Sequence, residues 1–465
     1  MKFPMRFTTR LVQSSIWLKW QSRDWVRKNG LRWISYMKYV KYILLKNTIR
    51  RDDLSTLFAA HRYYQTSFMT NRVCQALLGA SDHLETFVDA AGFAGLDRVA
   101  RRTIVLKNPE IREGRIEKGV LLITFTETFP FFYQHIDCER LLKYFYVVLE
   151  PSWAGYCDAN ILFWMKYKPS PVVVEASEIQ DFRFLESLGS NLIPVSFGAS
   201  DWVDFRIFNP VPSEKKTYDS IYVTNYHPIK RHHVFFKALR EIGDPTYSAA
   251  LAFGQNGDAK QEIGQLIDYY NIRNNVTIYE RLPQQQLNTI LSKAKVNVLL
   301  SLKEGSNRSI FEALFTNVPG IVLKNNVGVN KSYINEMTGR LIDESELAQV
   351  LQEFRTSWEK YSPREWALKN ISPLVTTRKL SETLQKCARE RGELWSKDLA
   401  PKINAPEVEY FYAETAGSML KSRKVIELFL NERHRATPND HELHQHLIAV
   451  LPSNQSSQAV SSSQS

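Results

Sequence analysis

The chain has 465 residues, 44% of them hydrophobic, and is long enough for two domains with apolar cores. Its four cysteines lie far apart without metal-ligand spacing, so we expect buried thiols in a reducing compartment rather than disulfides or a metal site. The net charge of +11 comes from one end, because residues 1–51 hold thirteen Lys or Arg against the single acidic residue Asp24.

Residues 1–51 mix these basic side chains with aromatic ones among short apolar stretches. No run approaches the ~20 apolar residues that span a bilayer, and Lys19, Arg23 and Arg27 interrupt any signal-peptide core. The pattern is typical of a helix that lies on an anionic membrane surface. The alternative is a basic helical hairpin packed on the protein's own surface. We expect no nucleic-acid partner, because no binding module is visible.

The next stretch predicts one half of an α/β protein. Residues 54–96 have helical apolar spacing, and helical stretches then alternate with strands predicted at 102–106, 119–125, 144–149 and 172–174. This alternation favours a parallel sheet whose strand-end loops bind ligand. Such loops carry Glu127 and Trp153, and His135 lies in a helix-like stretch, but ordinary connections would give the same pattern. Residues 191–212 are turn-rich and predict a crossing to a second domain.

Residues 296–323 predict a strand, a polar loop, a helix, a turn and a second strand. Gly305 lets the loop turn sharply, and Ser306 or Asn307 can cap the helix. The carboxyl ends of parallel strands and the N-termini of helices favour anions.

Two carboxylates flank this loop and helix, Glu304 at the mouth and Glu312 about two turns into the helix. Carboxylates are better partners for hydroxyl groups than for anions. Together with the helix end, they indicate a ligand that joins phosphates to polyhydroxyl groups, such as a nucleotide sugar. The alternative is a pair of surface charges at a spacing that occurs by chance.

Further motifs follow one another in a recognisable order: HPIKRHHVFFKAL (227–239), FGQNG (253–257), YERLPQQQLNTILSKAKVNVLLS (279–301), Glu304 and Glu312 with NVP (317–319), and TGRLID (338–343). Segment 220–343 thereby resembles the C-terminal half of retaining GT-B-fold glycosyltransferases of the family 4 type (glycosyl transferases group 1). Lys230 stands at the lysine position of the family's Arg-x4-Lys motif. Asn225 replaces the arginine of that motif, and Arg231 is a candidate substitute for its charge.

The resemblance implies an α/β GT-B fold with two Rossmann-like domains facing a cleft, a basic aromatic N-terminal helical segment and extra C-terminal helices. We place the boundaries at 1–60 for the helical segment with possible membrane contact, 61–205 for an acceptor-side domain, 206–375 for a nucleotide-sugar-binding domain, 376–452 for C-terminal helices and 453–465 for a disordered tail.

The implied activity moves a sugar from a nucleoside-diphosphate sugar to a glycan or lipid-linked acceptor, with retention of configuration, as in polysaccharide biosynthesis. Lys230 would neutralise the diphosphate, and Glu304 would contact the donor sugar. The donor-binding residues would be Glu312 (to the ribose), Gly305, Asn307, Arg308, Ser309, Arg231 and Gly254. The first half of the chain does not show the family's usual glycine-rich loop, so the acceptor-side candidates Glu127, Trp153 and His135 rest only on the loops and the helix-like stretch described above. We expect no cofactor and no metal, since the chain has no Asp-x-Asp pair.

Two alternatives use the same fold, a nucleotide-sugar epimerase and a membrane-associated scaffold that binds a nucleotide sugar without turning it over. We expect a cytoplasmic protein, peripheral at the inner face of the membrane. Deleting residues 1–51 should remove membrane contact and leave donor binding intact.

Overall fold

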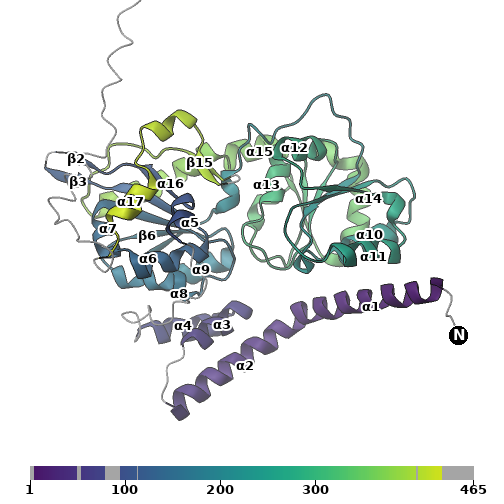
Figure 1. Ribbon diagram of the computed structural model, residues 1–465, viewed down its shortest axis with the longest axis horizontal. Coiled ribbons are helices and arrows are strands. Elements are labelled where there is room, and N and C mark those ends of the chain that lie inside the picture. Colours follow the sequence, from purple (N-terminus) through teal and green to yellow (C-terminus); the bar gives the residue numbers. More distant parts are fainter. Residues whose placement is uncertain (1–4, 50–53, 79–94, 113, 405–406, 432–465) are drawn as a thin grey trace, which may run out of the picture.

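The computed structural model describes residues 5–49, 54–78, 95–112, 114–404 and 407–431 (Figure 1). Two α/β domains lie next to each other, and a long N-terminal helical segment runs along one side of both. The predicted tail at 453–465 lies outside the described residues, as do residues 79–94 of the predicted helical stretch.

The N-terminal domain is built on a five-stranded sheet in the order β1-β4-β5-β6-β7. Its strands are β1 (Thr103–Lys107), β4 (Gly119–Thr124), β5 (Phe145–Glu150), β6 (Val172–Glu175) and β7 (Leu192–Val195), and a separate hairpin contains β2 (Glu110–Arg112) and β3 (Arg115–Glu117). The helices are α5 (Leu96–Arg101), α6 (Phe129–His135), α7 (Cys138–Tyr144), α8 (Ala159–Leu162) and α9 (Ile179–Ser187).

Two sequence-based expectations are wrong for this sheet. β1 pairs antiparallel with β4, whereas the remaining pairs are parallel as expected. Residues 192–195, predicted to begin the domain crossing, form a further parallel strand. Pro194 argues against a strand in the sequence, because proline has no backbone N–H to donate. However, β7 is the edge strand of the sheet, where the missing N–H of a proline is tolerated.

Side chains of the sheet alternate between two apolar layers, as strand geometry requires. Val147 and Leu149 pack into the layer that contains the helices between the strands. Tyr146 and Val148 pack into a layer closed by Leu380 and other residues of α16 (Pro373–Glu390). The chain therefore returns from the second domain to cover the first, as the sequence predicts for residues 363–399.

The C-terminal domain contains a fully parallel sheet in the order β10-β9-β8-β11-β12-β13. Its strands are β8 (Ser220–Thr224), β9 (Ala249–Phe253), β10 (Val276–Glu280), β11 (Asn297–Leu299), β12 (Gly320–Leu323) and β13 (Gly339–Ile342). Its helices are α10 (His232–Ile242), α11 (Lys260–Tyr269), α12 (Gln284–Ser292), α13 (Arg308–Phe315), α14 (Leu347–Ser357) and α15 (Pro363–Asn370). The strand order reverses between β8 and β11, which creates a topological switch point. Two such Rossmann-like domains constitute a GT-B fold, which confirms the expected fold class.

The N-terminal segment forms one almost continuous helix, not a hairpin: α1 (Met5–Trp25), a π-helical turn (Val26–Gly30), α2 (Leu31–Leu44) and a second π-helical turn (Leu45–Ile49). Trp20 of α1 belongs to the apolar core of the C-terminal domain. Tyr42 of α2 belongs to the core of the N-terminal domain, which also includes α3 (Leu54–Tyr63) and α4 (Ser67–Leu78). Within the described ranges, no helix combines the length and apolar character needed to cross a membrane.

The prediction of helices at 376–452 is wrong for the part around residues 402–410, and residues 432–452 lie outside the described residues. After α16 comes a hairpin of β14 (Lys402–Asn404) and β15 (Val408–Tyr410), and then the short helix α17 (Ser422–Leu428). The two strands are only three residues long, so their alternation is too brief to stand out in the sequence.

Candidate functional site

Lys230 and Glu304 meet at the switch point of the C-terminal sheet. Lys230 ends a 3₁₀ turn (Pro228–Lys230) that follows β8, and Glu304 lies in the loop that follows the adjacent strand β11. The Nζ atom of Lys230 lies 2.5 Å from Oε1 of Glu304, and 14% and 8% of the two side chains are exposed. Two residues 74 positions apart therefore form one charged pair where this fold class binds ligands.

Helix α13 begins directly after this loop, as the sequence predicts. Asn307 is its N-cap, and its Oδ1 atom accepts hydrogen bonds from the backbone N–H of Ile310 at 3.3 Å and the hydroxyl of Ser309 at 2.8 Å. The N-terminal end of α13 thus adds the positive end of a helix dipole to the neighbourhood of Glu304.

Arg308 and Glu312 form a second pair, one turn apart on α13. The Nε atom of Arg308 donates to Oε1 of Glu312 at 2.7 Å, and Nη1 donates to the carbonyl of Asn404 at 3.0 Å. Burial raises the pKa of Glu312, and the charge and hydrogen bond of Arg308 oppose this shift. The guanidinium of Arg308 is therefore directed to Glu312 and β14.

Arg231 also departs from its predicted role. Its side chain is fully buried and donates to both carboxylate oxygens of Asp24, at 2.5 and 2.8 Å, and to the carbonyl of Leu300 at 3.0 Å. It does not replace the arginine that Asn225 displaces, because its guanidinium is held by the N-terminal helix. The side-chain oxygen of Asn225 instead accepts the backbone N–H of His227 at 3.1 Å.

The two glycines singled out in the sequence have different surroundings. A Cβ on Gly305 would come 1.8 Å from the carbonyl oxygen of Ser152, so the loop of Glu304 touches the N-terminal domain directly. The backbone N–H of Ala154 donates to the carbonyl of Glu304 at 3.3 Å across the same contact. A Cβ on Gly254 would meet only the carbonyl of Thr224, at 3.7 Å.

A pocket of about 260 Å³ lies between the domains. Its walls come from the ends of β4 and β5, the start of α13 and the β14–β15 hairpin, and they include Thr124, Phe125, Glu150, Ser152, Ser306, Arg308, Asn404 and Glu407. Glu150 is held by Lys402 at 2.6 Å and by Asn404 at 2.9 Å. The sequence points to the 150–153 loop but misses Lys402 and Asn404, which come from more than 250 residues away.

None of the three predicted acceptor-side residues lines this pocket. Glu127 forms an ion pair with Arg98 at 2.8 Å. Trp153 is 53% exposed and lies outside the pocket wall. The ring of His135 packs on Phe131 with centroids 4.8 Å apart, at the C-terminal end of α6. The expectation that these three form an acceptor site is therefore not supported by their positions.

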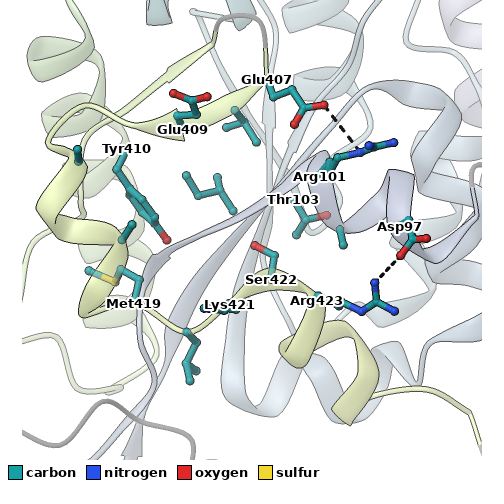
Figure 2. Close-up of a pocket in the computed structure, with 16 residues that line it drawn as sticks. Asp97, Arg101, Thr103, Glu407, Glu409, Tyr410, Met419, Lys421, Ser422 and Arg423 are labelled. Carbon is teal, nitrogen blue, oxygen red and sulfur yellow. Dashed lines mark hydrogen bonds and ion pairs between the residues drawn. The ribbon is translucent and has the colours of Figure 1, made fainter.

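A larger pocket of about 930 Å³ adjoins this one and shares Glu407 and Val408 with it (Figure 2). It lies between α5, β1 and the segment 407–423. Two ion pairs lie at the rim of this larger pocket, Arg101–Glu407 and Arg423–Asp97 (Figure 2). The segment 407–423 thus contributes walls to both pockets.

The described residues contain no group of three or more His, Cys, Asp or Glu side chains placed to hold a metal ion. The Lys230–Glu304 pair and the N-terminus of α13 are the charged groups that the switch point offers to a ligand.

Comparisons with known proteins give one family and several similar folds. Residues 204–365 match the family described as Glycosyl transferases group 1, so this segment is a domain of that family. The chain has no detectable relative among curated proteins.

Among solved structures, a crystal structure of TarM is 16% identical, over 56% of this chain and 54% of that chain, with a TM-score of 0.45. Sucrose-phosphate synthase from Thermosynechococcus elongatus is 16% identical over 58% of this chain and 74% of its own, with a TM-score of 0.47. The pneumococcal O-GlcNAc transferase GtfA, in complex with UDP and GlcNAc, is 14% identical over 58% of this chain and 56% of its own, with a TM-score of 0.43. The match spans about half the length of TarM and GtfA.

Proposed function

We propose that this chain, which carries a glycosyl transferases group 1 domain at residues 204–365, is a retaining glycosyltransferase that uses a nucleoside-diphosphate sugar. The acceptor is a glycan or a lipid-linked molecule, and no metal is required. The observation that carries the proposal is the Lys230–Glu304 pair at the switch point, next to the N-terminus of α13. A cation, a carboxylate and a helix end together match a ligand of diphosphate and sugar hydroxyls.

Each group has a separate part in the reaction. Lys230 and the N-terminus of α13 stabilise the negative charge that develops on the departing diphosphate. Glu304 accepts hydrogen bonds from hydroxyls of the donor sugar and fixes its orientation. Glu312 accepts hydrogen bonds from the ribose hydroxyls, in exchange for the hydrogen bond that Arg308 donates to it.

Retention is accounted for by attack on the face that the diphosphate leaves. The bond between the anomeric carbon and the phosphate oxygen breaks, a bond to the acceptor oxygen forms, and the acceptor's proton passes to the phosphate. The protein then needs no separate general base. The pocket of about 260 Å³ beside Ser306 and Glu150 is the proposed place for the acceptor's reactive end, since it joins the N-terminal domain to the donor helix.

The outer face of the N-terminal helical segment supports peripheral binding to an anionic membrane. Its exposed apolar side chains recur at helical spacing and include Leu18, Trp25, Trp33, Tyr36, Met37, Val40 and Leu44. Exposed basic residues such as Arg32 and Lys41 lie on the same segment. Its one acidic residue, Asp24, is buried, so the exposed charge is entirely positive.

Asn225 favours one alternative, a protein that binds a nucleotide sugar without transferring it. At this position the family has a cation, and here the amide oxygen accepts a backbone hydrogen bond instead. One positive charge fewer at the diphosphate weakens stabilisation of the leaving group more than it weakens donor binding.

The experiment that separates these cases is a thermal-shift screen with UDP-, GDP- and ADP-sugars, followed by an assay of nucleoside-diphosphate release. UDP-sugars are tested first, because similar structures such as GtfA were determined with UDP. A donor at 100 times its dissociation constant adds about 2.7 kcal/mol of stability. A transferase also releases the nucleoside diphosphate and loses this turnover in Glu304→Gln. Binding without turnover in the unmutated protein indicates the alternative, and absence of both rejects the proposal.

A further inference from the structure

Asp24 is unusual in its surroundings. It is the only acidic residue among residues 1–51, and only 3% of it is exposed, although it belongs to a helix whose outer face is basic. Carboxylates are rarely buried unless their charge is compensated. Burial acts to raise the pKa of Asp24, but the nearby ring of His233, 3.6 Å away, and the hydrogen bonds and charge of Arg231 outweigh it and hold the pKa well below its usual range. Asp24 is therefore a buried anion with dedicated partners.

The main partner of Asp24 is Arg231, which forms a bidentate ion pair with its carboxylate. Nε of Arg231 lies 2.5 Å from one carboxylate oxygen and Nη2 lies 2.8 Å from the other. Such bidentate pairs fix the orientation of both groups. Glu344 accepts a further hydrogen bond from Arg231, and Lys28 bridges Asp24 and Glu344 at 3.0 and 2.8 Å. The guanidinium is thus surrounded by groups that hold it in one position.

Arg231 connects the N-terminal helix to both loops of the switch point. It follows Lys230 directly, and its backbone is left-handed, with φ 59° and ψ 43°, a conformation that non-glycine residues adopt only when their surroundings enforce it. Its Nη1 atom donates to the carbonyl of Leu300, at the start of the loop that carries Glu304. One buried side chain therefore ties together the two loops whose tips form the Lys230–Glu304 pair.

A second contact reaches the same turn from the same helix. Nη1 of Arg27 donates to the carbonyl of Pro228 at 2.8 Å. The turn Pro228–Lys230 is consequently held at its first residue by Arg27 and just after its last residue by Asp24, acting through Arg231.

We infer that Asp24 is a positioning residue of the donor site, and that the N-terminal helix is a working part of that site rather than only a membrane contact. Through Arg231 it sets the position of Lys230 relative to Glu304, and so the geometry in which the diphosphate is held. The inference rests on the proposed function and extends it to a residue in the first tenth of the chain. It also reverses the expectation that residues 1–51 can be deleted without affecting the donor.

The test compares Asp24→Asn with Glu262→Gln in the full chain. Glu262 of α11 anchors the same helix through Lys19 and Trp20, outside the donor loops, and is therefore a matched control for loosening of the helix. Calorimetric titration with UDP, below the unfolding temperature of every variant, should give a dissociation constant at least 10-fold higher for Asp24→Asn and nearly unchanged for Glu262→Gln. Asp24→Glu, which keeps the charge, should recover part of the affinity.

The double variant Asp24→Asn/Arg231→Gln distinguishes a purely structural role of Asp24 from a role in positioning the donor site. It removes the buried positive charge that Asp24→Asn leaves with only Glu344 as its carboxylate partner, so its unfolding temperature should rise above that of Asp24→Asn while UDP affinity stays low. If affinity returns with stability, or if Asp24→Asn and Glu262→Gln bind UDP equally well, the inference is wrong and the proposed function stands. If the unmutated protein binds none of UDP, GDP and ADP, the proposed function fails and the inference fails with it.

Discussion

The ammonium group of Lys230 and the carboxylate of Glu304 neutralise each other. Both charges are largely removed from water, so neither can be left without a partner at low cost. A nucleotide sugar that binds as proposed exchanges this pair for two new ones, with the diphosphate on Lys230 and a sugar hydroxyl on Glu304. The pair therefore holds the two side chains close to the positions in which the donor needs them.

Replacing Lys230 with alanine should raise the dissociation constant of UDP by roughly 10- to 100-fold, because a hydrogen bond to a charged group contributes about 1.5–3 kcal/mol. Calorimetric titration measures the change. Lys237→Ala is the matched control, since Lys237 lies on the neighbouring helix α10, is largely exposed and pairs with Glu241. Equal affinities in the two variants would show that Lys230 does not contact the diphosphate.

Gly305→Ala should push the domains apart, because its Cβ would overlap the carbonyl of Ser152. We expect a loss of about 1–3 kcal/mol of stability from this overpacking, together with a larger radius of gyration in X-ray scattering. Gly254→Ala is the control, as its Cβ meets only ordinary contacts. It should unfold at the wild-type temperature. A Gly305→Ala protein with wild-type stability and dimensions would mean that the loops do not touch in solution.

Asp201 should make stability depend on pH. Burial raises the pKa of Asp201 from 3.8 to about 7, so the folded protein keeps a proton that the unfolded chain releases. Its contribution is complete below about pH 4 and is lost as the pH rises through 7, by up to about 4 kcal/mol. Urea unfolding at pH 5 and pH 8 measures this loss. Asp201→Asn should reduce the difference in unfolding free energy between the two pH values. If that difference is unchanged in the variant, groups other than Asp201 cause the pH dependence.

Trp33→Ser and Met37→Ser should each weaken binding to phosphatidylserine vesicles by about 10-fold, because each removes an exposed apolar side chain worth at least about 1.5 kcal/mol on burial. Vesicle sedimentation measures the binding, which should also fall with added salt. Trp153→Ser is the control, an exposed tryptophan outside the helical segment. Wild-type sedimentation of the two helix variants, or equal binding to neutral vesicles, would reject membrane contact by this face.

The sequence predicts the elements around Glu304 well because the signals there are local. Gly305, the Asn307 cap and Pro319 act within a few residues, and α13 and β12 begin and end close to the expected positions. The observed strand order places β8 beside β11, so that Lys230 and Glu304 come together at the switch point, but the sequence does not predict that order.

The remaining parts of the site depend on contacts that local pattern does not encode. Asp24 and Arg231 are 207 positions apart, and a buried arginine beside a conspicuous lysine has the sequence appearance of a second phosphate contact. Lys402 reaches Glu150 from a hairpin of two three-residue strands. In each case the partner is selected by tertiary packing, which one sequence does not reveal.

The long N-terminal helix also determines how the two domains can move. Trp20 anchors α1 by packing in the core of the C-terminal domain, and Tyr42 anchors α2 by packing in the core of the N-terminal domain. Between them lies the π-helical turn Val26–Gly30, the kind of irregularity at which helices bend. Rotating the domains apart must bend the helix at this turn or remove Trp20 or Tyr42 from its core. A flat surface that kept the helix straight would oppose this bending. Attachment of the helix to a surface would then be mechanically coupled to closure of the cleft between the two domains.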